Sequence, residues 1–251
     1  MTADQALGGK IALVTGASSG LGRATALALA RAGAAVGLVA RSATDLQVVA
    51  DDIAESGGRS ASVPADLADP AQINAAVDQT RSELGPIGVV VNAAGTDVPA
   101  PIEKLSVSDW DRVLDVNLRA PYLLAQAVFP DMRRLGRGTI VIVGSVAGRR
   151  GWPEAAAYCS SKFGLTGLTQ VLNAEGRAHH IRSCLLYPGA MDTNWGVWNP
   201  DDRSSGNLSR PVAESLPADH VADLITWICA APAEMVVNEA TVTPLLEQGW
   251  P

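Results

Sequence analysis

The sequence predicts an α/β fold in which a doubly wound parallel β-sheet of about seven strands is flanked by helices on both faces. Short apolar runs, typical of buried strands, alternate with longer segments of helical periodicity along the whole chain. The 251 residues suffice for one large core, and no repeat or linker divides them, so we expect a single domain over residues 1–251. The runs expected as strands are residues 10–15, 35–40, 60–65, 87–92, 139–144, 181–189 and 235–244.

Composition narrows the class of protein. Apolar residues make up 47% of the chain, charged residues 18%, and the net charge is −7. This balance argues against nucleic acid or an anionic membrane surface as the main partner. The first ten residues lack the features of a signal peptide, and no apolar run approaches a membrane span. The three cysteines are far apart and show no zinc spacing, so we expect a cytoplasmic protein with reduced thiols and no metal.

The first strand, residues 10–15, runs directly into a glycine-rich loop at residues 16–22 (GASSGLG) and then an Ala- and Leu-rich helix. Gly16 would allow the tight turn, and Gly20 would let a pyrophosphate approach the helix N-terminus. Gly22 would allow close packing of helix and strand. Because strand and helix flank the loop, we favour a Rossmann-like dinucleotide site over an ordinary glycine-rich turn.

The second strand, residues 35–40, ends at Ala40 and is followed by Arg41. A site for NAD would place Asp or Glu here to bind the ribose hydroxyls. A missing carboxylate and an available guanidinium favour the 2′-phosphate of NADP. The alternative is that Arg41 is a solvated loop cation.

Polar residues also follow the third and fourth strands. After residues 60–65 comes Asp66-Leu67, where the carboxylate would either accept from an adenine amino group or cap the next helix, about 69–84. The strand at residues 87–92 ends in Asn92-Ala93-Ala94-Gly95, and the small residues directly after the strand would let a flat ligand lie close to the backbone. The proline-bearing loop that follows, residues 96–101, is a plausible side of a pocket.

Residues 105–134 carry helical periodicity on both sides of Pro121 and contain Asn117. Asparagine is a poor helix former, so its place within a helix calls for a reason. It would be either a buried group wedged against a neighbouring backbone or part of a polar relay.

The strand at residues 139–144 leads to Ser145, and an Ala- and Ser-rich helix then carries Tyr158 and Lys162 one turn apart on one face. An ammonium beside a phenol favours the phenolate and would lower the tyrosine pKa from its usual value of about 10. A tyrosine tuned in this way exchanges a proton with an alcohol or carbonyl oxygen. The alternative is a surface tyrosine beside a solvated lysine. Only three of the 19 Lys and Arg residues are lysines, which favours a specific role for Lys162.

The same helix contains Gly164 and Gly167, whose spacing suggests close approach of another element or subunit. The sixth strand ends at Pro188-Gly189. Residues 190–217 are rich in Pro, Gly, Ser and Asp and are expected to form a substrate lid, before a helix at residues 218–230.

Half of the six tryptophans lie beside the expected site: Trp152 follows Ser145, and Trp195 and Trp198 lie within the expected lid. They suggest a largely apolar substrate. The alternative is that they pack against another subunit.

Together these features resemble the short-chain dehydrogenase/reductase family, in its single-domain branch with TGxxxGxG and YxxxK motifs. The resemblance covers residues 8–244. The matching residues, in the family's order, are Thr15, Gly16, Gly20, Gly22, Asp66, Asn92 to Gly95, Asn117, Ser145, Tyr158, Lys162, Pro188, Gly189 and Thr193.

The resemblance implies an NADP(H)-dependent oxidoreductase that interconverts a carbonyl and an alcohol by hydride transfer. Tyr158 would be the general acid/base, Ser145 would bind the reacting oxygen, and Lys162 would bind the nicotinamide ribose and lower the Tyr158 pKa. Asn117 would link Lys162 to solvent through a water molecule. Cofactor contacts are implied for Gly16, Ser18, Ser19, Gly20, Leu21, Arg41, Asp66, Leu67, Asn92, Ala93, Gly95, Tyr158, Lys162, Pro188, Gly189 and Thr193, and substrate contacts are expected for Ser145, Trp152 and Trp195.

In this family the helices that carry Asn117 and Tyr158 usually form a dimer interface, so a homodimer or, more often, a homotetramer is implied. The C-terminal segment, residues 237–251, lacks the V-D-G-G-like ending of the fatty-acid-synthesis reductases and is more similar to relatives that act on assorted alcohols and hydroxy acids. A catalytically silent dinucleotide sensor on the same fold is the alternative from another class. It predicts a degraded set of catalytic residues, whereas all four are present.

Overall fold

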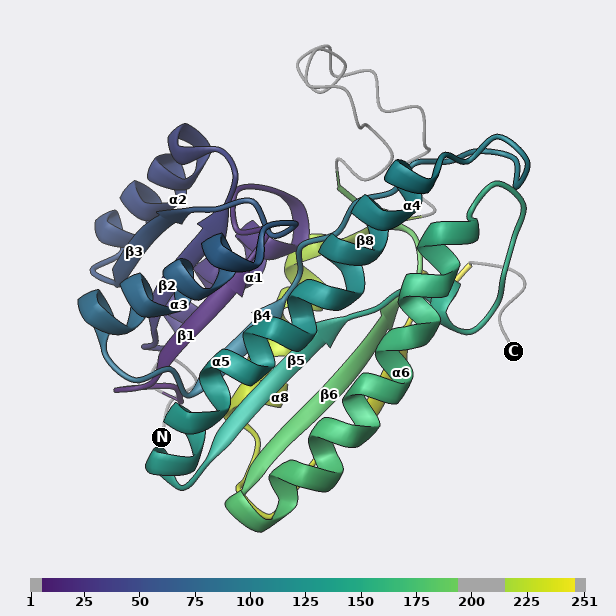
Figure 1. Ribbon diagram of the computed structural model, residues 1–251. Helices are drawn as coiled ribbons and strands as arrows, with labels where there is room; N and C mark the ends of the chain where they lie inside the picture. The colour runs from purple at the N-terminus through teal and green to yellow at the C-terminus, as the bar shows by residue number, and fades with distance from the viewer. Residues whose placement is uncertain (1–5, 194–214, 247–251) are drawn as a thin grey trace.

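The computed structural model describes residues 6–193 and 215–246. Its centre is a parallel sheet of seven strands in the order β3-β2-β1-β4-β5-β6-β9 (Figure 1). The strands are β1 (Ile11–Thr15), β2 (Ala35–Ala40), β3 (Arg59–Pro64), β4 (Val89–Asn92), β5 (Gly138–Val143), β6 (Ile181–Pro188) and β9 (Glu239–Val242). The predicted Rossmann-like, doubly wound architecture is therefore confirmed.

The order of the strands places a switch point at the middle of the sheet. The chain runs outward from β1 to β3, then returns to the other side of β1 and continues from β4 to β9. In sheets of this kind the crevice for a ligand opens at the carboxyl ends of the strands, where the direction reverses. Here that crevice lies between the ends of β1 and β4, which pair directly.

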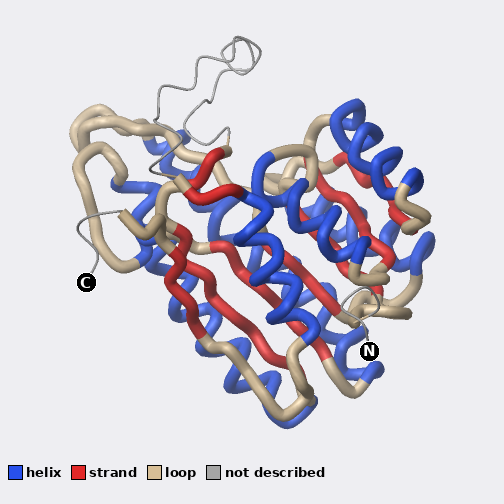
Figure 2. The backbone as a smooth tube through the Cα atoms, turned by 180° about the vertical axis from the view of Figure 1, so that it is seen from behind, coloured by secondary structure: helices blue, strands red, loops and turns tan. Residues whose placement is uncertain are grey.

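Helices cover both faces of the sheet, as Figure 1 and the reverse view in Figure 2 show. Alternate residues of each strand point to opposite faces, so Val14 and Val36 pack in one apolar cluster while Leu13 and Val39 pack in the other. The first face carries α1 (Gly20–Arg31), α2 (Ala43–Glu55) and α8 (Ala218–Ala230), and the second carries α3 (Pro70–Leu84), α5 (Ala120–Leu135) and α6 (Ala156–Gly176).

The expected helix at residues 105–134 is one helical rod with an irregular centre. It consists of α4 (Val107–Leu114), a π-helical turn η2 (Asp115–Arg119) and α5. Pro121 lies in the first turn of α5, and Asn117 lies in the π-helical turn. Turns of this kind are rare and occur frequently at functional sites.

The two glycines of α6 have different surroundings. A Cβ on Gly164 would lie 2.8 Å from the side chain of Leu118 in η2, so the expected close approach occurs here within the chain. A Cβ on Gly167 would meet no described atom within 4 Å. Gly167 therefore faces open space in the single chain.

A small second sheet joins the two ends of the expected lid. It pairs β7 (Met191–Asp192) with β8 (Leu216–Pro217). Trp195 and Trp198 lie outside the described residues, so the lid itself stays a prediction. Within residues 6–193 and 215–246, no helix is long and apolar enough to cross a membrane.

Candidate active site

The four expected catalytic residues come from three segments near the carboxyl ends of β4 and β5. Ser145 lies two residues beyond β5 and begins the short 3-10 helix η3 (Val146–Gly148). Tyr158 and Lys162 lie one turn apart in α6, and Asn117 lies in η2. Asn117, Tyr158 and Lys162 are buried, and Ser145 is partly buried.

Tyr158 and Ser145 form a hydrogen-bonded pair. The hydroxyl oxygen of Ser145 accepts from the backbone N–H of Ala147 at 3.1 Å. Since that contact uses an acceptor lone pair of Ser145, its own hydroxyl proton remains available for the oxygen of Tyr158. The serine is thus oriented by the backbone and aimed at the phenol.

Lys162 is held by the backbone of β5. Its Nζ donates to the carbonyl oxygen of Val143, the last residue of β5, at 2.9 Å. The same nitrogen lies 5.5 Å from the centroid of the Tyr158 ring. Burial lowers the pKa of Lys162 to about 8, because the interior disfavours the charged ammonium.

The pKa of Tyr158 differs from the sequence-based prediction. We expected Lys162 to lower it, but burial raises it well above the usual value, and the hydrogen bond from Ser145 opposes this increase only in part. The physical reason is that phenolate and ammonium both lose hydration in this interior, so each charged form is disfavoured. In the protein alone, Tyr158 is therefore a protonated phenol at neutral pH.

Asn117 fixes the loop that follows β4. Its Oδ1 accepts from the N–H of Thr96 at 2.8 Å, and its Nδ2 donates to the carbonyl of Thr96 at 2.8 Å and to Ser161 at 3.1 Å. These bonds match the interpretation of a buried group wedged against a neighbouring backbone. The relay to Lys162 stays a prediction.

The glycine-rich loop has the geometry that its sequence predicts. Gly16 and Gly20 have φ of 67° and 52°, a region that favours glycine. A Cβ on Gly22 would lie 2.2 Å from the carbonyl oxygen of Gly16, so no larger residue fits. Ser19 precedes α1 without capping it by its side chain, which leaves the first-turn N–H groups of this helix available for a phosphate. The observed cradle therefore fits a dinucleotide.

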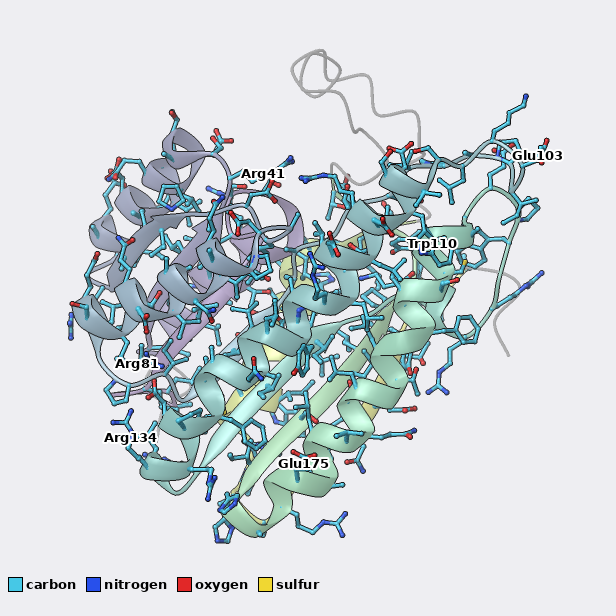
Figure 3. All side chains as sticks on the ribbon, viewed as in Figure 1. Arg41, Arg81, Glu103, Trp110, Arg134 and Glu175 are labelled. Carbon is cyan, nitrogen blue, oxygen red and sulfur yellow. The ribbon has the colours of Figure 1, made fainter. Side chains whose placement is uncertain are left out.

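Two further observations are consistent with a bound dinucleotide. Arg41 directly follows β2 and is exposed, and no ion pair or hydrogen bond ties its guanidinium to the described residues (Figure 3). Asn92, at the end of β4, is buried, and neither polar atom of its side chain has a hydrogen-bond partner among the residues that the structure describes. Buried polar atoms without partners are uncommon.

One of the two roles considered for Asp66, capping of the next helix, is wrong. The residue that caps α3 is Asp69, which accepts a hydrogen bond from the N–H of Ala71 at 2.8 Å. Asp66 instead accepts from Ala68 at 3.0 Å and forms an ion pair with Arg112 at 3.3 Å. Its role toward an adenine stays a prediction.

Thr193 is a further expected residue that the structure places at the glycine-rich loop. A Cβ on Gly20 would lie 3.3 Å from the Cβ of Thr193, so the end of β7 lies over the glycine loop. Trp152, in the loop after η3, is 42% exposed, whereas Trp195 lies outside the described residues. The others are found at strand ends or in the glycine loop: Ser18, Leu21, Leu67, Ala93, Gly95, Pro188 and Gly189.

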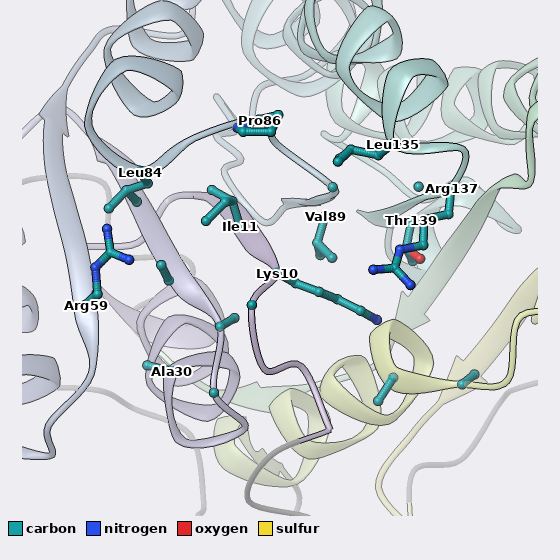
Figure 4. Close-up of a pocket in the computed structure, with 18 of the residues that line it drawn as sticks. Lys10, Ile11, Ala30, Arg59, Leu84, Pro86, Val89, Leu135, Arg137 and Thr139 are labelled. Atoms are coloured by element: carbon teal, nitrogen blue, oxygen red, sulfur yellow. The ribbon is translucent and has the colours of Figure 1, made fainter.

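A cavity of about 870 Å³ lies at the opposite edge of the sheet, at the amino ends of the strands (Figure 4). Lys10, Arg59, Arg137 and Arg182 contribute to its lining. Lys10 donates to the carbonyl of Cys229 at 3.2 Å, and Arg182 donates to several carbonyls at the end of α8. Cations are favoured at helix C-termini, which accounts for these two side chains without a ligand.

Sequence analysis missed Asp97, which lies in the loop held by Asn117. Its negative charge contributes to the raised pKa of Tyr158. The only signal was a carboxylate two residues beyond Gly95, in a loop expected to border the pocket.

The fold and the residues at its carboxyl edge define an oxidoreductase of the dinucleotide-binding α/β class. A family model described as short chain dehydrogenase matches residues 10–203. The chain therefore belongs to the short-chain dehydrogenase/reductase family.

Relatives support this assignment over nearly the whole chain. A D-threitol dehydrogenase from Mycolicibacterium smegmatis is 34% identical over 93% of this chain and 90% of its own. A 3-oxoacyl-[acyl-carrier-protein] reductase from Escherichia coli is 31% identical over 92% of this chain and 94% of its own. A crystal structure of a metagenomic short-chain oxidoreductase in complex with NADP is 32% identical, with a TM-score of 0.83, and covers 96% of this chain and 100% of the other.

Proposed function

We propose that this protein is an NADP(H)-dependent oxidoreductase that interconverts a ketone or aldehyde and the corresponding alcohol, with Tyr158 as general acid/base. The observation that carries the proposal is the hydrogen-bonded pair of Tyr158 and Ser145, with buried Lys162 on the same helix face. This group lies at the edge of the sheet where the glycine-rich loop begins α1.

The chemistry follows from the protonation states. The bound cofactor supplies a hydride when reduced and accepts one when oxidised. Tyr158, whose raised pKa keeps it protonated, donates its proton to the carbonyl oxygen during reduction and takes it back in oxidation. Ser145 hydrogen-bonds the same oxygen and holds it beside the phenol. Lys162 stabilises the phenolate that Tyr158 becomes when its proton has left.

The preference for NADP(H) rests on Arg41. The carboxyl end of β2 offers this guanidinium without a partner among the described residues, and it offers no carboxylate at the position that would bind ribose hydroxyls. The NADP bound to the similar metagenomic oxidoreductase supports the same cofactor.

The substrate is proposed to be a small carbonyl compound or alcohol. The name of the Mycolicibacterium relative points to a polyol, D-threitol. The largely apolar substrate expected from the tryptophans is supported here only by exposed Trp152. The partly buried carboxylate of Asp97 adds a polar group to the same region.

A second proposal concerns assembly. Apolar side chains of Tyr122 on α5 and of Phe163 and Val171 on α6 are about half exposed, and Gly167 faces open space between the latter two. We propose that this face packs against a second copy of the chain and that the assembly is a homodimer or homotetramer. The cysteines Cys159, Cys184 and Cys229 are buried and free, which fits the proposed cytoplasmic location.

The first experiment titrates the purified protein with NADPH and NADH by fluorescence. It then follows nicotinamide absorbance against a panel of ketones, aldehydes and alcohols. We expect tighter binding of NADPH and turnover of at least one carbonyl compound. Tight binding without any turnover would favour the dinucleotide sensor, and the absence of binding to either cofactor would overturn the proposal.

A further inference from the structure

Asp97 is a carboxylate in the loop that pairs with the residues before the helix of Tyr158, and the proposed chemistry does not use it. It lies in the loop between β4 and α4, and its side chain is only partly exposed. Its Oδ1 accepts from the backbone N–H of Val98 at 2.8 Å. No Lys, Arg or His of the described chain forms an ion pair with it.

Both ends of the segment that carries Asp97 are fixed. On one side, Asn117 holds the N–H and the carbonyl of Thr96, the preceding residue, at 2.8 Å each. On the other side, the N–H of Ala100 donates to the carbonyl of Glu154 at 3.0 Å, and Ala100 pairs with Ala155, the residue before α6. The segment therefore spans from η2 to the start of the helix that carries Tyr158, and its position is set by the fold.

The electrostatics agree with this placement. Burial raises the pKa of Asp97, and the Asp97 charge contributes to the raised pKa of Tyr158. A carboxylate taken partly out of water without a cation destabilises the protein alone. Groups of this kind, placed in a crevice beside a general acid, are typical of sites that a ligand completes.

We propose that Asp97 is a substrate-specificity residue that hydrogen-bonds a second hydroxyl group, on a carbon close to the one that reacts, so that the substrates are polyols and hydroxyketones. The inference rests on the proposed function, because Tyr158 must bind the reacting oxygen. A group that also contacts Asp97 must then be attached near that carbon.

The chemistry of Asp97 favours a hydroxyl over an ammonium group as its partner. A hydroxyl donates and accepts, so it pairs with the side chain whether it is carboxylate or carboxylic acid. An ammonium group would pair only with the carboxylate and would bring a second cation toward Lys162, which is already buried. A hydroxyl group is therefore the better partner for Asp97, because it pairs with either protonation state of the side chain and brings no second cation toward Lys162.

The test compares three ketones that share one reacting carbon: 2-butanone, 1-hydroxy-2-butanone and 1-amino-2-butanone. Reduction by NADPH is measured for the wild type, Asp97→Ala and Asp97→Asn. The ratio of kcat/KM for the hydroxyketone to that for 2-butanone is compared between proteins. Since intrinsic reactivity is the same for every protein, a change in this ratio isolates the contribution of the side chain. Activity with 2-butanone serves as the internal check of folding.

Glu103→Gln is the matched control. It removes one negative charge from the same loop, but Glu103 is exposed at the outer tip (Figure 3). We expect Asp97→Ala to lower the ratio by about tenfold or more, the loss typical of a hydrogen bond to a charged group. Asp97→Asn is expected to lie between Ala and wild type, and Glu103→Gln to keep the wild-type ratio.

A pH profile is a second readout, and it tests whether the Asp97 charge acts on Tyr158. Because the Asp97 charge raises the pKa of Tyr158, its removal in Asp97→Asn is expected to shift the profile of alcohol oxidation to lower pH. An unchanged ratio in Asp97→Ala, or a wild-type preference for the aminoketone, would overturn the inference while leaving the oxidoreductase function intact. If the wild type reduced none of the wider carbonyl panel, the proposed function would fail instead.

Discussion

At the scale of single residues, Tyr158 is the place where two physical effects oppose each other. Burial raises its pKa, and the hydrogen bond from Ser145 lowers it by less. The outcome is a phenol that holds its proton at neutral pH and is suited to donate it. The roles of the two residues in catalysis follow from this arrangement as proposals.

The first prediction concerns Tyr158→Phe, which removes only the hydroxyl. We expect kcat to fall by about 10²–10⁴-fold, the usual contribution of general acid catalysis, while NADPH binding is largely retained. Steady-state kinetics and fluorescence titration measure the two effects. Tyr187→Phe is the matched control, because this buried tyrosine bonds Thr166 at 2.9 Å and has no proposed catalytic role. Near-native turnover by Tyr158→Phe would show that the acid/base is misassigned.

The second prediction concerns Arg41→Asp. Loss of the guanidinium removes its contact to the 2′-phosphate, and the new carboxylate can accept from ribose hydroxyls. We expect the ratio of kcat/KM for NADPH over NADH to fall by about tenfold or more. Arg59→Asp makes the same charge change at the amino end of β3, beside the other cavity, and is expected to leave the ratio unchanged. An unaltered preference in Arg41→Asp would refute the role in phosphate binding.

At the scale of elements, close contacts of the backbone determine the site. The absence of a side chain at Gly22 allows α1 to lie close to the carbonyl of Gly16 in the glycine-rich loop, since a Cβ there would lie 2.2 Å from that oxygen. The π-helical turn η2 positions Asn117 so that it holds Thr96. Both features fix the positions of backbone groups around the candidate site.

The third prediction concerns Gly22→Ala. The new Cβ would lie 2.2 Å from a backbone oxygen, so α1 or the loop must move. We expect the free energy of unfolding to fall by about 1–3 kcal/mol, together with weaker NADPH binding. Urea denaturation and fluorescence titration provide the measurements. Gly151→Ala is the control at a glycine outside the proposed subunit interface, since no described atom lies within 4 Å of its Cβ position. Equal stability of Gly22→Ala and wild type would contradict the steric argument.

At the scale of the whole molecule, the candidate active site lowers the stability of the folded protein. Lys162 is buried with its ammonium bonded to a single backbone carbonyl of β5, and its pKa is lowered from 10.5 to about 8. At pH 7 the lysine is charged in both the folded and the unfolded state, so folding must bury that charge. A shift of this size corresponds to about 3 kcal/mol as an upper bound.

The fourth prediction follows from this cost. Lys162→Met removes the charge and keeps most of the volume, so we expect a higher free energy of unfolding at pH 7, by about 1–3 kcal/mol, together with loss of turnover. Urea denaturation without cofactor measures the stability. Lys104→Met, at an exposed lysine, is expected to change neither quantity appreciably. A less stable Lys162→Met protein would mean that the ammonium stabilises the fold.

Local sequence patterns determined most of the architecture. The apolar run at residues 35–40 and the helix at residues 218–230 occur with the predicted bounds, because strand and helix periodicity are properties of short segments. Alternation of such segments then restricts the topology to a parallel doubly wound sheet. The glycine spacing likewise predicted the turn after β1, because positive φ is a local demand on one residue.

Tertiary structure decided what depends on distant residues. Three interactions join segments that are far apart in the sequence. They are the ion pair of Asp66 with Arg112, the hydrogen bonds of Asn117 to Thr96, and the electrostatic effect of Asp97 on Tyr158. The direction of the Tyr158 pKa shift was likewise decided by the tertiary structure. Spacing placed Lys162 beside Tyr158, but only the packed interior determines how much hydration both side chains lose, and here burial raises the pKa of Tyr158 and lowers that of Lys162.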